Sequence, residues 1–580
     1  MVKVPVRIPV FLAALSLAAL AGAAAARPSA QSPAAPTPGV VAAANPLAVD
    51  AGIEILGKGG NAVDAAVAIQ AMLGLVEPQS SGLGGGGFMM YYDAKSGAIT
   101  AFDGREKAPA GATADMFLDE HGRPLSYLAA VRTGRSTGVP GAIAMLFAAH
   151  ERTGVLPWRE LFAPAIRAAT DGFTVTARLA GYLAPDSSLP PTPDVRALFA
   201  RPDGQPLQIG DRFRNPEYAH TLKRLAAEGP RALYTGSIAA EIVKRTHAAP
   251  LPGTMTLTDL ARYRADADKP LCRPYLQYSV CVPPPPSSGV SLLQLLMMLD
   301  FTDIARRGPS DPQAWFLFAQ ATRIMYADRD QYVADPKFIA VPVEALLNPA
   351  YLAARAQLIG NRVGPAPAAG VIPGFPRAAD TTREAAGTSH FVALDAAGNV
   401  VTMTTTVESV FGSGRTVAGF VLNNQLTDFS AEPADEHGPI ANAVAGGKRP
   451  RSSMAPVIIL DHDGRFVAAL GSPGGSAILA YNAKAVVGIL AWHLSMQAAF
   501  ELPNVIARGE QFSGEAARLS PEVLAGLRDR GIDLAGGRAE GSGLHGLMRK
   551  IDGSYEGGAD SRREGVVRML PAAAGGRSGP

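Results

Sequence analysis

The feature that most constrains this chain is a strand, turn, strand pattern that begins directly after Gly387-Thr388. Residues 389–394 and 400–406 run apolar and β-branched, and residues 395–399 between them, Asp-Ala-Ala-Gly-Asn, carry turn chemistry. The pattern predicts a β-hairpin. Thr388 therefore stands where a strand begins.

A threonine in this place has two interpretations. If the chain is cut before Thr388, one residue holds both a hydroxyl nucleophile and an α-amine base, whose pKa of about 7.7 to 8.0 suits general-base work near neutral pH. In the other interpretation, Thr388 only opens an edge strand. The hairpin alone favours this second interpretation.

Charge and length exclude some partners. The chain has 580 residues, enough for a large core, and its formal net charge of +2 includes no basic or acidic block. We therefore expect no nucleic-acid partner and no anionic membrane surface as partner.

The first residues have the pattern of a targeting segment. Lys3 and Arg7 precede an apolar run over residues 8–24, and small residues follow as a cleavage site before Arg27. A retained anchor is disfavoured because the run is short and ends in alanines. No other stretch of the sequence approaches the length of a membrane span. We expect a signal peptide over residues 1–26 and an exported mature protein, periplasmic or secreted, without a stable membrane span.

Cysteines, histidines and glycines give weaker signals. Cys272 and Cys281 either bridge a short hairpin or remain two buried thiols, and the spacing leaves both open. No histidine pair has metal-ligand spacing, so we predict no metal site. Residues 82–87 match the letters of a dinucleotide fingerprint, but a strand rather than a helix follows, so we predict no nucleotide cofactor there.

The rest of the chain divides into mixed ends and a helical middle. We predict helices over residues 47–56 and 62–76, and an unbroken helix over 343–359. We predict further hairpins from residues 88–92 with 98–103 and from 457–461 with 466–470. The Pro/Gly/Ala-rich residues 364–387 predict an exposed, mobile segment, at whose end a cut would break no element.

Several motifs in fixed order change the interpretation of Thr388. The chain resembles the γ-glutamyltransferases (γ-glutamyl transpeptidases), a family of N-terminal-nucleophile hydrolases, over nearly its whole mature length. The motifs are GGNAVDAAVA from Gly59, LGGGGFM from Leu83, FDGREKAP from Phe102, PPPPSSG from Pro283, YADRDQYVADPKF from Tyr326, TTTVE from Thr404, NNQLTDF from Asn423, KRPRSSM from Lys448 and GSPGG from Gly471.

The resemblance implies an α+β fold, a four-layer αββα sandwich, in two chains from one precursor. Thr388 would cut the Gly387–Thr388 bond, leaving a large chain, residues 27–387, and a small catalytic chain, residues 388–580. Thr388 would then attack γ-glutamyl amides such as glutathione. Water, or an amino acid or peptide amine, would resolve the γ-glutamyl ester. No cofactor is implied.

The resemblance also implies a role for each site residue. Thr406 would orient the Thr388 hydroxyl, and the backbone N–H groups of Gly474 and Gly475 would bind the oxyanion. The donor's α-carboxylate would bind Arg105, Ser452 and Ser453. Its α-ammonium would bind Glu408, Gln425 and Asp428.

Two departures from the family pattern concern this site. Many members carry Asn where this chain has Glu408, although others have Glu. The loop over residues 430–447, which resembles the flap over the donor site, is shorter than in some bacterial relatives and lacks their aromatic residue. This puts flap closure, and the balance of hydrolysis against transfer, in question.

Two rival functions remain. A glutaryl-cephalosporin-type amide hydrolase of the same fold would leave Glu408 and Asp428 facing a substrate without an α-amine, at a cost of about 1 to 3 kcal/mol. An unprocessed, non-catalytic binding protein predicts loss of Thr388 or of the oxyanion glycines. Neither is lost in this sequence.

Overall fold

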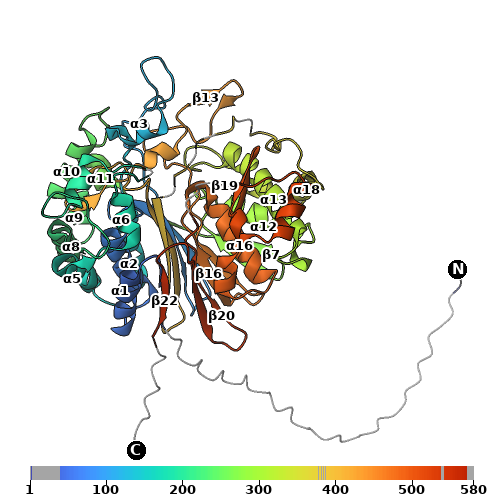
Figure 1. Cartoon of the computed structure of the whole chain (residues 1–580), viewed down its shortest axis with the longest axis horizontal. Helices are drawn as coiled ribbons and strands as arrows, with labels where there is room; N and C mark the ends of the chain where they lie inside the picture. Colours follow the sequence, from blue (N-terminus) through green and yellow to red (C-terminus); the bar gives the residue numbers. More distant parts are fainter. Residues whose placement is uncertain are drawn as a thin grey trace, which may run out of the picture. The chain divides into compact units, whose positions relative to one another are not determined.

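The computed structural model describes residue 2 and residues 39–187, 189–375, 378–380, 382, 384–385, 387–536 and 541–570. Apart from Val2, the predicted targeting segment lies outside these residues. The fold is α+β, and two antiparallel sheets lie face to face between two layers of helices (Figure 1).

The first sheet contains the predicted hairpin at its centre. Its strands, in spatial order, are β22 (Val566–Met569), β1 (Val40–Ala43), β9 (Gly387–Leu394), β10 (Val400–Glu408), β2 (Gly86–Tyr92), β3 (Ile99–Asp103) and β6 (Asp266–Asp268). Strand β9 pairs with β1 on one side and β10 on the other, so Thr388 heads a central strand. The interpretation of Thr388 as the start of an edge strand is therefore wrong.

The second sheet combines one hairpin from within the helical middle with strands of the C-terminal part. Its order is β21 (Tyr555–Ala559), β20 (His545–Arg549), β16 (Phe466–Gly471), β15 (Val457–Leu460), β8 (Tyr278–Val282) and β7 (Leu271–Tyr275). Cys272 lies opposite Cys281 in the β7–β8 register, and a disulfide joins them.

Side chains of β9 alternate between two separate cores, as the period of a strand requires. Phe391 and Ala393 pack toward the helices, whereas Val392 and Leu394 pack between the sheets. Thr388 has the same parity as Val392, and so it belongs to the face between the sheets.

The helices fall into two groups, one for each sheet. One core contains residues of the first sheet and of α1 (Pro46–Gly57), α2 (Ala62–Val76), α4 (Ala142–Thr153), α5 (Ala163–Asp171), α6 (Ala177–Leu183), α8 (Pro216–Glu228) and α10 (Gly236–Thr246), of which α1, α2 and α4 contact its strands. The other core contains residues of the second sheet and of α12 (Gly289–Asp300), α13 (Pro312–Tyr332), α15 (Pro349–Ala356), α16 (Ile478–Leu490), α17 (Met496–Glu501) and α18 (Pro521–Asp529), of which α12, α16 and α17 contact its strands.

The turn of the central hairpin also fixes a helix. The Asp395 carboxylate accepts hydrogen bonds from Ala397 N and Asn399 N inside the turn, and from Ala62 N at the start of α2. Asn61 and Asp64 form a capping box at the same helix end. Local turn chemistry therefore holds the β9–β10 turn against the start of α2.

Two predictions about the chain before Thr388 need correction. The predicted helix over residues 343–359 is divided into α14 (Val343–Leu346), α15 and a 3-10 turn (Gln357–Ile359), because Pro349 starts a new helix behind its cap Asn348. The segment over residues 364–387 was expected to be exposed, but Ile372, Ala378 and Asp380 in it are buried.

Candidate active site

Thr406 joins the Thr388 hydroxyl to the peptide bond that precedes it. Thr388 lies opposite Thr406 in the β9–β10 register. The Thr388 hydroxyl donates to Thr406 Oγ1 at 3.1 Å, and the Thr406 hydroxyl donates to the carbonyl oxygen of Gly387 at 2.7 Å. Thr406 thus orients the Thr388 hydroxyl. It also contacts the Gly387 carbonyl, the group that the hydroxyl would attack if the chain were cut before Thr388.

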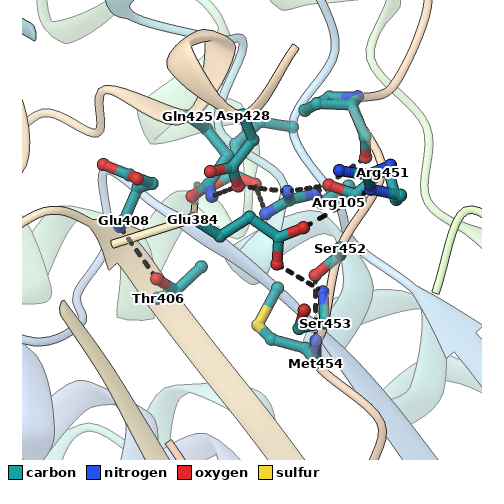
Figure 2. A network of polar contacts seen from close by, with 12 residues as sticks. Arg105, Glu384, Thr406, Glu408, Gln425, Asp428, Arg451, Ser452, Ser453 and Met454 are labelled. Carbon is teal, nitrogen blue, oxygen red and sulfur yellow. Dashed lines mark hydrogen bonds and ion pairs between the residues drawn. The ribbon is translucent and has the colours of Figure 1, made fainter. Parts of the chain in front are cut away.

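A bulge distorts the sheet beside this bond. The β9–β10 register shifts between Thr406 and Glu408, so that Glu408 lies opposite Gly387. Glu408 has a φ of +79°, a left-handed conformation that is costly for a residue with a side chain. Its backbone N–H donates to Thr406 Oγ1 at 2.8 Å (Figure 2). The bulge therefore turns the Glu408 carboxylate into the site.

Gly387 lies in a place that admits no side chain. A Cβ there would lie 2.4 Å from the carbonyl oxygens of both Glu408 and Ser409. Backbone carbonyls in a paired strand cannot move away cheaply, so only glycine fits opposite the bulge.

Most of the predicted site residues surround one small pocket, which we call the inner pocket. Its free volume is only about 10 Å³. Nine predicted residues line it: Thr388, Thr406, Gly475, Arg105, Glu408, Gln425, Asp428, Ser452 and Ser453. Gly474, directly before Gly475, has a φ of +136°, and a Cβ there would lie 2.5 Å from the Tyr481 ring.

The residues directly before the Gly387–Thr388 bond enter the inner pocket. We call them the upstream tail, of which Glu384, Ala385 and Gly387 are described. Glu384 and Ala385 line the inner pocket, and a Cβ on Gly475 would lie 2.4 Å from each of their carbonyl oxygens. The backbone at the predicted oxyanion site therefore packs directly against the upstream tail.

Arg105 and Asp428, predicted to bind the α-carboxylate and the α-ammonium of a donor, bind each other here. Arg105 Nη2 donates to Asp428 Oδ2 at 2.5 Å, and Gln425 Nε2 donates to the same oxygen at 2.7 Å. Both charged groups are buried. Burial raises the pKa of Asp428, and the Arg105 guanidinium opposes that rise. Glu384 and Glu408 are the other two carboxylates that line the pocket.

Glu408 is held by a residue that the sequence did not single out. Tyr127 OH, from α3 (Tyr127–Val131), lies 2.9 Å from Glu408 Oε2, and Ala385 N donates to Glu408 Oε1 at 3.0 Å. Asn424 also donates to this carboxylate. Burial, and the nearby Asp428, raise the pKa of Glu408. The aromatic side chain that contacts Glu408 thus comes from α3, whereas residues 430–447 contain no aromatic residue.

The serine pair faces a carboxylate of the chain itself. Ser453 N donates to Glu384 Oε2 at 2.8 Å. Two buried arginines face the same carboxylate: Arg329 is ion-paired with it and also donates to Ser453 Oγ at 2.7 Å, and Arg451 Nε lies 3.6 Å from Glu384 Oε1. Burial works against ionisation of Glu384, but the two guanidinium groups outweigh it and hold its pKa at about 2.

Sequence reasoning missed Glu384, Arg329 and Arg451 as members of the site. Arg329 and Arg451 lie inside the quoted motifs YADRDQY and KRPRSSM, so their positions carried a signal. Nothing in the sequence indicated that both would face a carboxylate four residues before Thr388. That pairing depends on how α13, which carries Arg329, lies against the loop that carries Arg451, Ser452 and Ser453.

The described residues contain no group of three or more histidine, cysteine or carboxylate side chains that could hold a metal ion. Within the same residues, no helix is both long and apolar enough to cross a membrane.

Fold and site together define the class. An αββα sandwich with a threonine at the head of a central strand, its hydroxyl hydrogen-bonded beside the preceding carbonyl, is the architecture of an N-terminal-nucleophile hydrolase.

Comparisons with known proteins give the family. The family model described as Gamma-glutamyltranspeptidase matches residues 48–570. The glutathione hydrolase proenzyme of Bacillus subtilis (strain 168) is 35% identical over 542 residues, 91% of each chain. The acylase ACY 1 proenzyme of Pseudomonas sp. (strain V22) is 35% identical over 537 residues, 91% of this chain and 93% of that one.

A solved structure agrees. Cephalosporin acylase from Bacillus halodurans superposes with a TM-score of 0.80 at 25% identity, covering 95% of this chain and 99% of that chain. The chain belongs to the gamma-glutamyltranspeptidase family.

Proposed function

We propose that this protein is a self-processing γ-glutamyltransferase and glutathione hydrolase. The observation that carries the proposal is the contact chain from the Thr388 hydroxyl through Thr406 to the Gly387 carbonyl. It puts a hydroxyl nucleophile and a polarising donor at the same peptide bond. The names of the relatives, which include glutathione hydrolase proenzyme, support the same function.

Self-cleavage proceeds by an acyl shift. The Thr388 oxygen attacks the carbonyl carbon of Gly387, the C–N bond breaks, and the hydroxyl proton ends on the freed amine. Water then hydrolyses the ester, which leaves a carboxylate on Gly387 and restores the Thr388 hydroxyl. The products are residues 27–387 and residues 388–580.

Turnover uses the same oxygen with a new base. The freed α-amine accepts the Thr388 hydroxyl proton as the oxygen attacks the γ-amide carbonyl of the donor, and passes it to the leaving amine. The N–H groups of Gly474 and Gly475 stabilise the oxyanion. Water resolves the ester to glutamate, whereas an amino acid or peptide amine gives a new γ-glutamyl amide.

The inner pocket supplies donor recognition. Ser452, Ser453 and Arg105 bind the α-carboxylate of the donor, and Glu408, Gln425 and Asp428 bind its α-ammonium. Burial makes an unpaired Glu408 charge costly, so an ammonium ligand gains from pairing with it.

The first experiment is intact mass and N-terminal sequencing of the purified protein. We expect two chains, the smaller beginning Thr388-Ser389-His390 and the larger beginning at Arg27, which also tests export. A single uncut chain without turnover would favour the non-catalytic binding protein.

A second experiment separates the γ-glutamyl function from that of a glutaryl-cephalosporin-type amide hydrolase. This alternative is tested because some similar proteins are named acylases. The mature protein is assayed with γ-glutamyl and glutaryl anilides that differ only in the α-amine. We expect at least tenfold higher kcat/KM for the γ-glutamyl anilide, because a glutaryl group leaves Glu408 unpaired. The reverse preference would assign the chain to the acylases.

A further inference from the structure

The upstream tail makes two contacts that match the two charged groups on the α-carbon of a γ-glutamyl donor. The Glu384 carboxylate accepts from Ser453 N, and the Ala385 N–H donates to the Glu408 carboxylate. The tail thus places a carboxylate at Ser452 and Ser453 and an N–H donor at the Glu408 carboxylate. Figure 2 places the Glu384 carboxylate among Arg105, Arg451 and Ser453.

The charges around Glu384 require an anion at this place. Arg329 and Arg451 are both buried, and their other acidic neighbours are Asp330 and Asp380. The Glu384 side chain is only 5% exposed. Without the Glu384 carboxylate, the buried guanidinium groups of Arg329 and Arg451 would have less negative charge near them. This is unfavourable unless another carboxylate takes the place of Glu384.

The position of Glu384 along the chain gives the contact a further consequence. In self-cleavage, the upstream tail is the acyl part of the bond that breaks, just as the γ-glutamyl group is the acyl part of a donor amide. Anchoring the tail four residues before Thr388 fixes the Gly387 carbonyl against Thr406 Oγ1. The inner pocket is predicted to bind the acyl part of a donor through its α-carboxylate. It would therefore bind the acyl part of its own chain, the upstream tail, through the Glu384 carboxylate.

We propose that Glu384 is a positioning residue for self-cleavage. Its carboxylate binds Ser453 N, Arg329 and Arg451 as a built-in substitute for the donor's α-carboxylate, and the upstream tail is the first ligand of the inner pocket. The proposal rests on the proposed function for the donor's identity. It also means that the tail must leave before a donor enters, because the inner pocket has only about 10 Å³ free.

The first test measures the self-cleavage rate of freshly purified precursor by intact mass over time. Glu384→Gln keeps the shape but loses the charge, so we expect about tenfold slower cleavage, with Glu384→Asp between it and the parent. Glu120→Gln, at a side chain that is 86% exposed, is the matched control and should cleave at the parental rate. Melting temperatures of Thr388→Ala precursors with and without Glu384→Gln show whether folding is affected.

The outcomes of this test are distinct. A parental cleavage rate in Glu384→Gln would overturn the proposal. Slower cleavage in Glu384→Gln, together with a rate in Glu384→Asp that lies between it and the parent, supports a role for the charge. Equal slowing in both variants, with a lowered melting temperature, would assign Glu384 a merely structural role and would also overturn it.

The second test asks whether the inner pocket binds the tail in trans. N-acetyl-Glu-Ala-Ala-Gly should inhibit γ-glutamyl anilide hydrolysis by the mature enzyme competitively, raising KM at constant kcat. The Gln-containing peptide should have an inhibition constant about tenfold higher. Equal constants, or a fall in kcat at constant KM, would overturn the proposal.

The two tests separate this proposal from the proposed function. Self-cleavage is measured without any donor, so Glu384-dependent cleavage without γ-glutamyl turnover would support the proposal while the function fails. γ-Glutamyl turnover together with self-cleavage that does not depend on Glu384 would support the proposed function and overturn this proposal.

Discussion

The two sides of the Gly387–Thr388 bond are held by different kinds of contact. Downstream, β9 pairs with β10 from Gly387 to Leu394 and also with β1 from Phe391 to Leu394. Upstream, the described residues from 360 to 385 contain neither helix nor strand, and Glu384 is held by Ser453 N and two arginine side chains.

The difference suggests how one chain serves as both substrate and enzyme. A ladder of backbone hydrogen bonds fixes the nucleophile permanently, because no ligand can replace a strand in the middle of a sheet. Contacts to a carboxylate and an N–H group, however, can be made equally well by a small molecule with the same groups. The upstream side is therefore exchangeable, and the downstream side is not.

The largest effect should come from the nucleophile on the fixed side. Thr388→Ala removes the attacking oxygen, so we expect an uncut chain and a loss of γ-glutamyl anilide turnover of at least about 10³-fold. Mass spectrometry and a rate assay measure the two. Thr388→Ser keeps a hydroxyl and should still cleave. Maturation and turnover in Thr388→Ala would show that another residue is the nucleophile.

Thr406 connects the two sides, and its loss should have the next largest effect. Thr406→Ala removes the donor to the Gly387 carbonyl and the acceptor of the Thr388 hydroxyl, so we expect about 10²-fold slower self-cleavage. The control is Thr405→Ala on the opposite face, where the hydroxyl donates to Gly86 O. Equal slowing in both variants would indicate a general effect on β10.

A side chain at Gly387 should disturb the junction of the two sides. In Gly387→Ala the new Cβ meets the carbonyl oxygens of Glu408 and Ser409 at 2.4 Å, which forces β9 and β10 apart at the bulge. We expect about tenfold slower self-cleavage by the intact-mass time course. Ala396→Ser, in the exposed turn of the same hairpin, should cleave normally. Parental cleavage in Gly387→Ala would mean that the bulge is not needed.

The smallest effect concerns a buried carboxylate behind Arg105, one of the residues that line the inner pocket. Glu106 is buried beside Arg105, whose Nη1 lies 3.8 Å away, and burial raises the pKa of Glu106 to about 8. Because the unfolded pKa is about 4.3, the folded state binds more protons between these values, and stability falls as pH rises toward 8. We expect the melting temperature of Glu106→Gln, relative to the parent, to rise from pH 5 to pH 8 and to level off above.

The control for this prediction is Glu120→Gln, at a side chain that is 86% exposed. Its melting temperature should follow the parent at every pH. Parallel pH profiles for Glu106→Gln and the parent would contradict the raised pKa of Glu106.

Local patterns predicted the elements of this fold well. The hairpin β9–β10, the capped helix α2 and the hairpin β15–β16 all lie where apolar periodicity and turn residues indicated. The helix over residues 343–359 was wrong because its apolar pattern continues across Pro349, where the chain starts a new helix. The apolar periodicity of a segment indicates which face of a helix is buried. The points at which a helix ends and a new one begins depend on single residues such as Pro349.

The sequence by itself determined the nucleophile strand, its turn and the glycine before it, because these follow from local backbone chemistry. Family motifs further implied the residues of the inner pocket. Only the tertiary structure decided that Arg105 pairs with Asp428, that Tyr127 reaches Glu408, and that Glu384 lies between Ser453 and two arginines. These contacts join residues far apart in the chain, and the charge of a side chain does not say which partner the fold will bring to it.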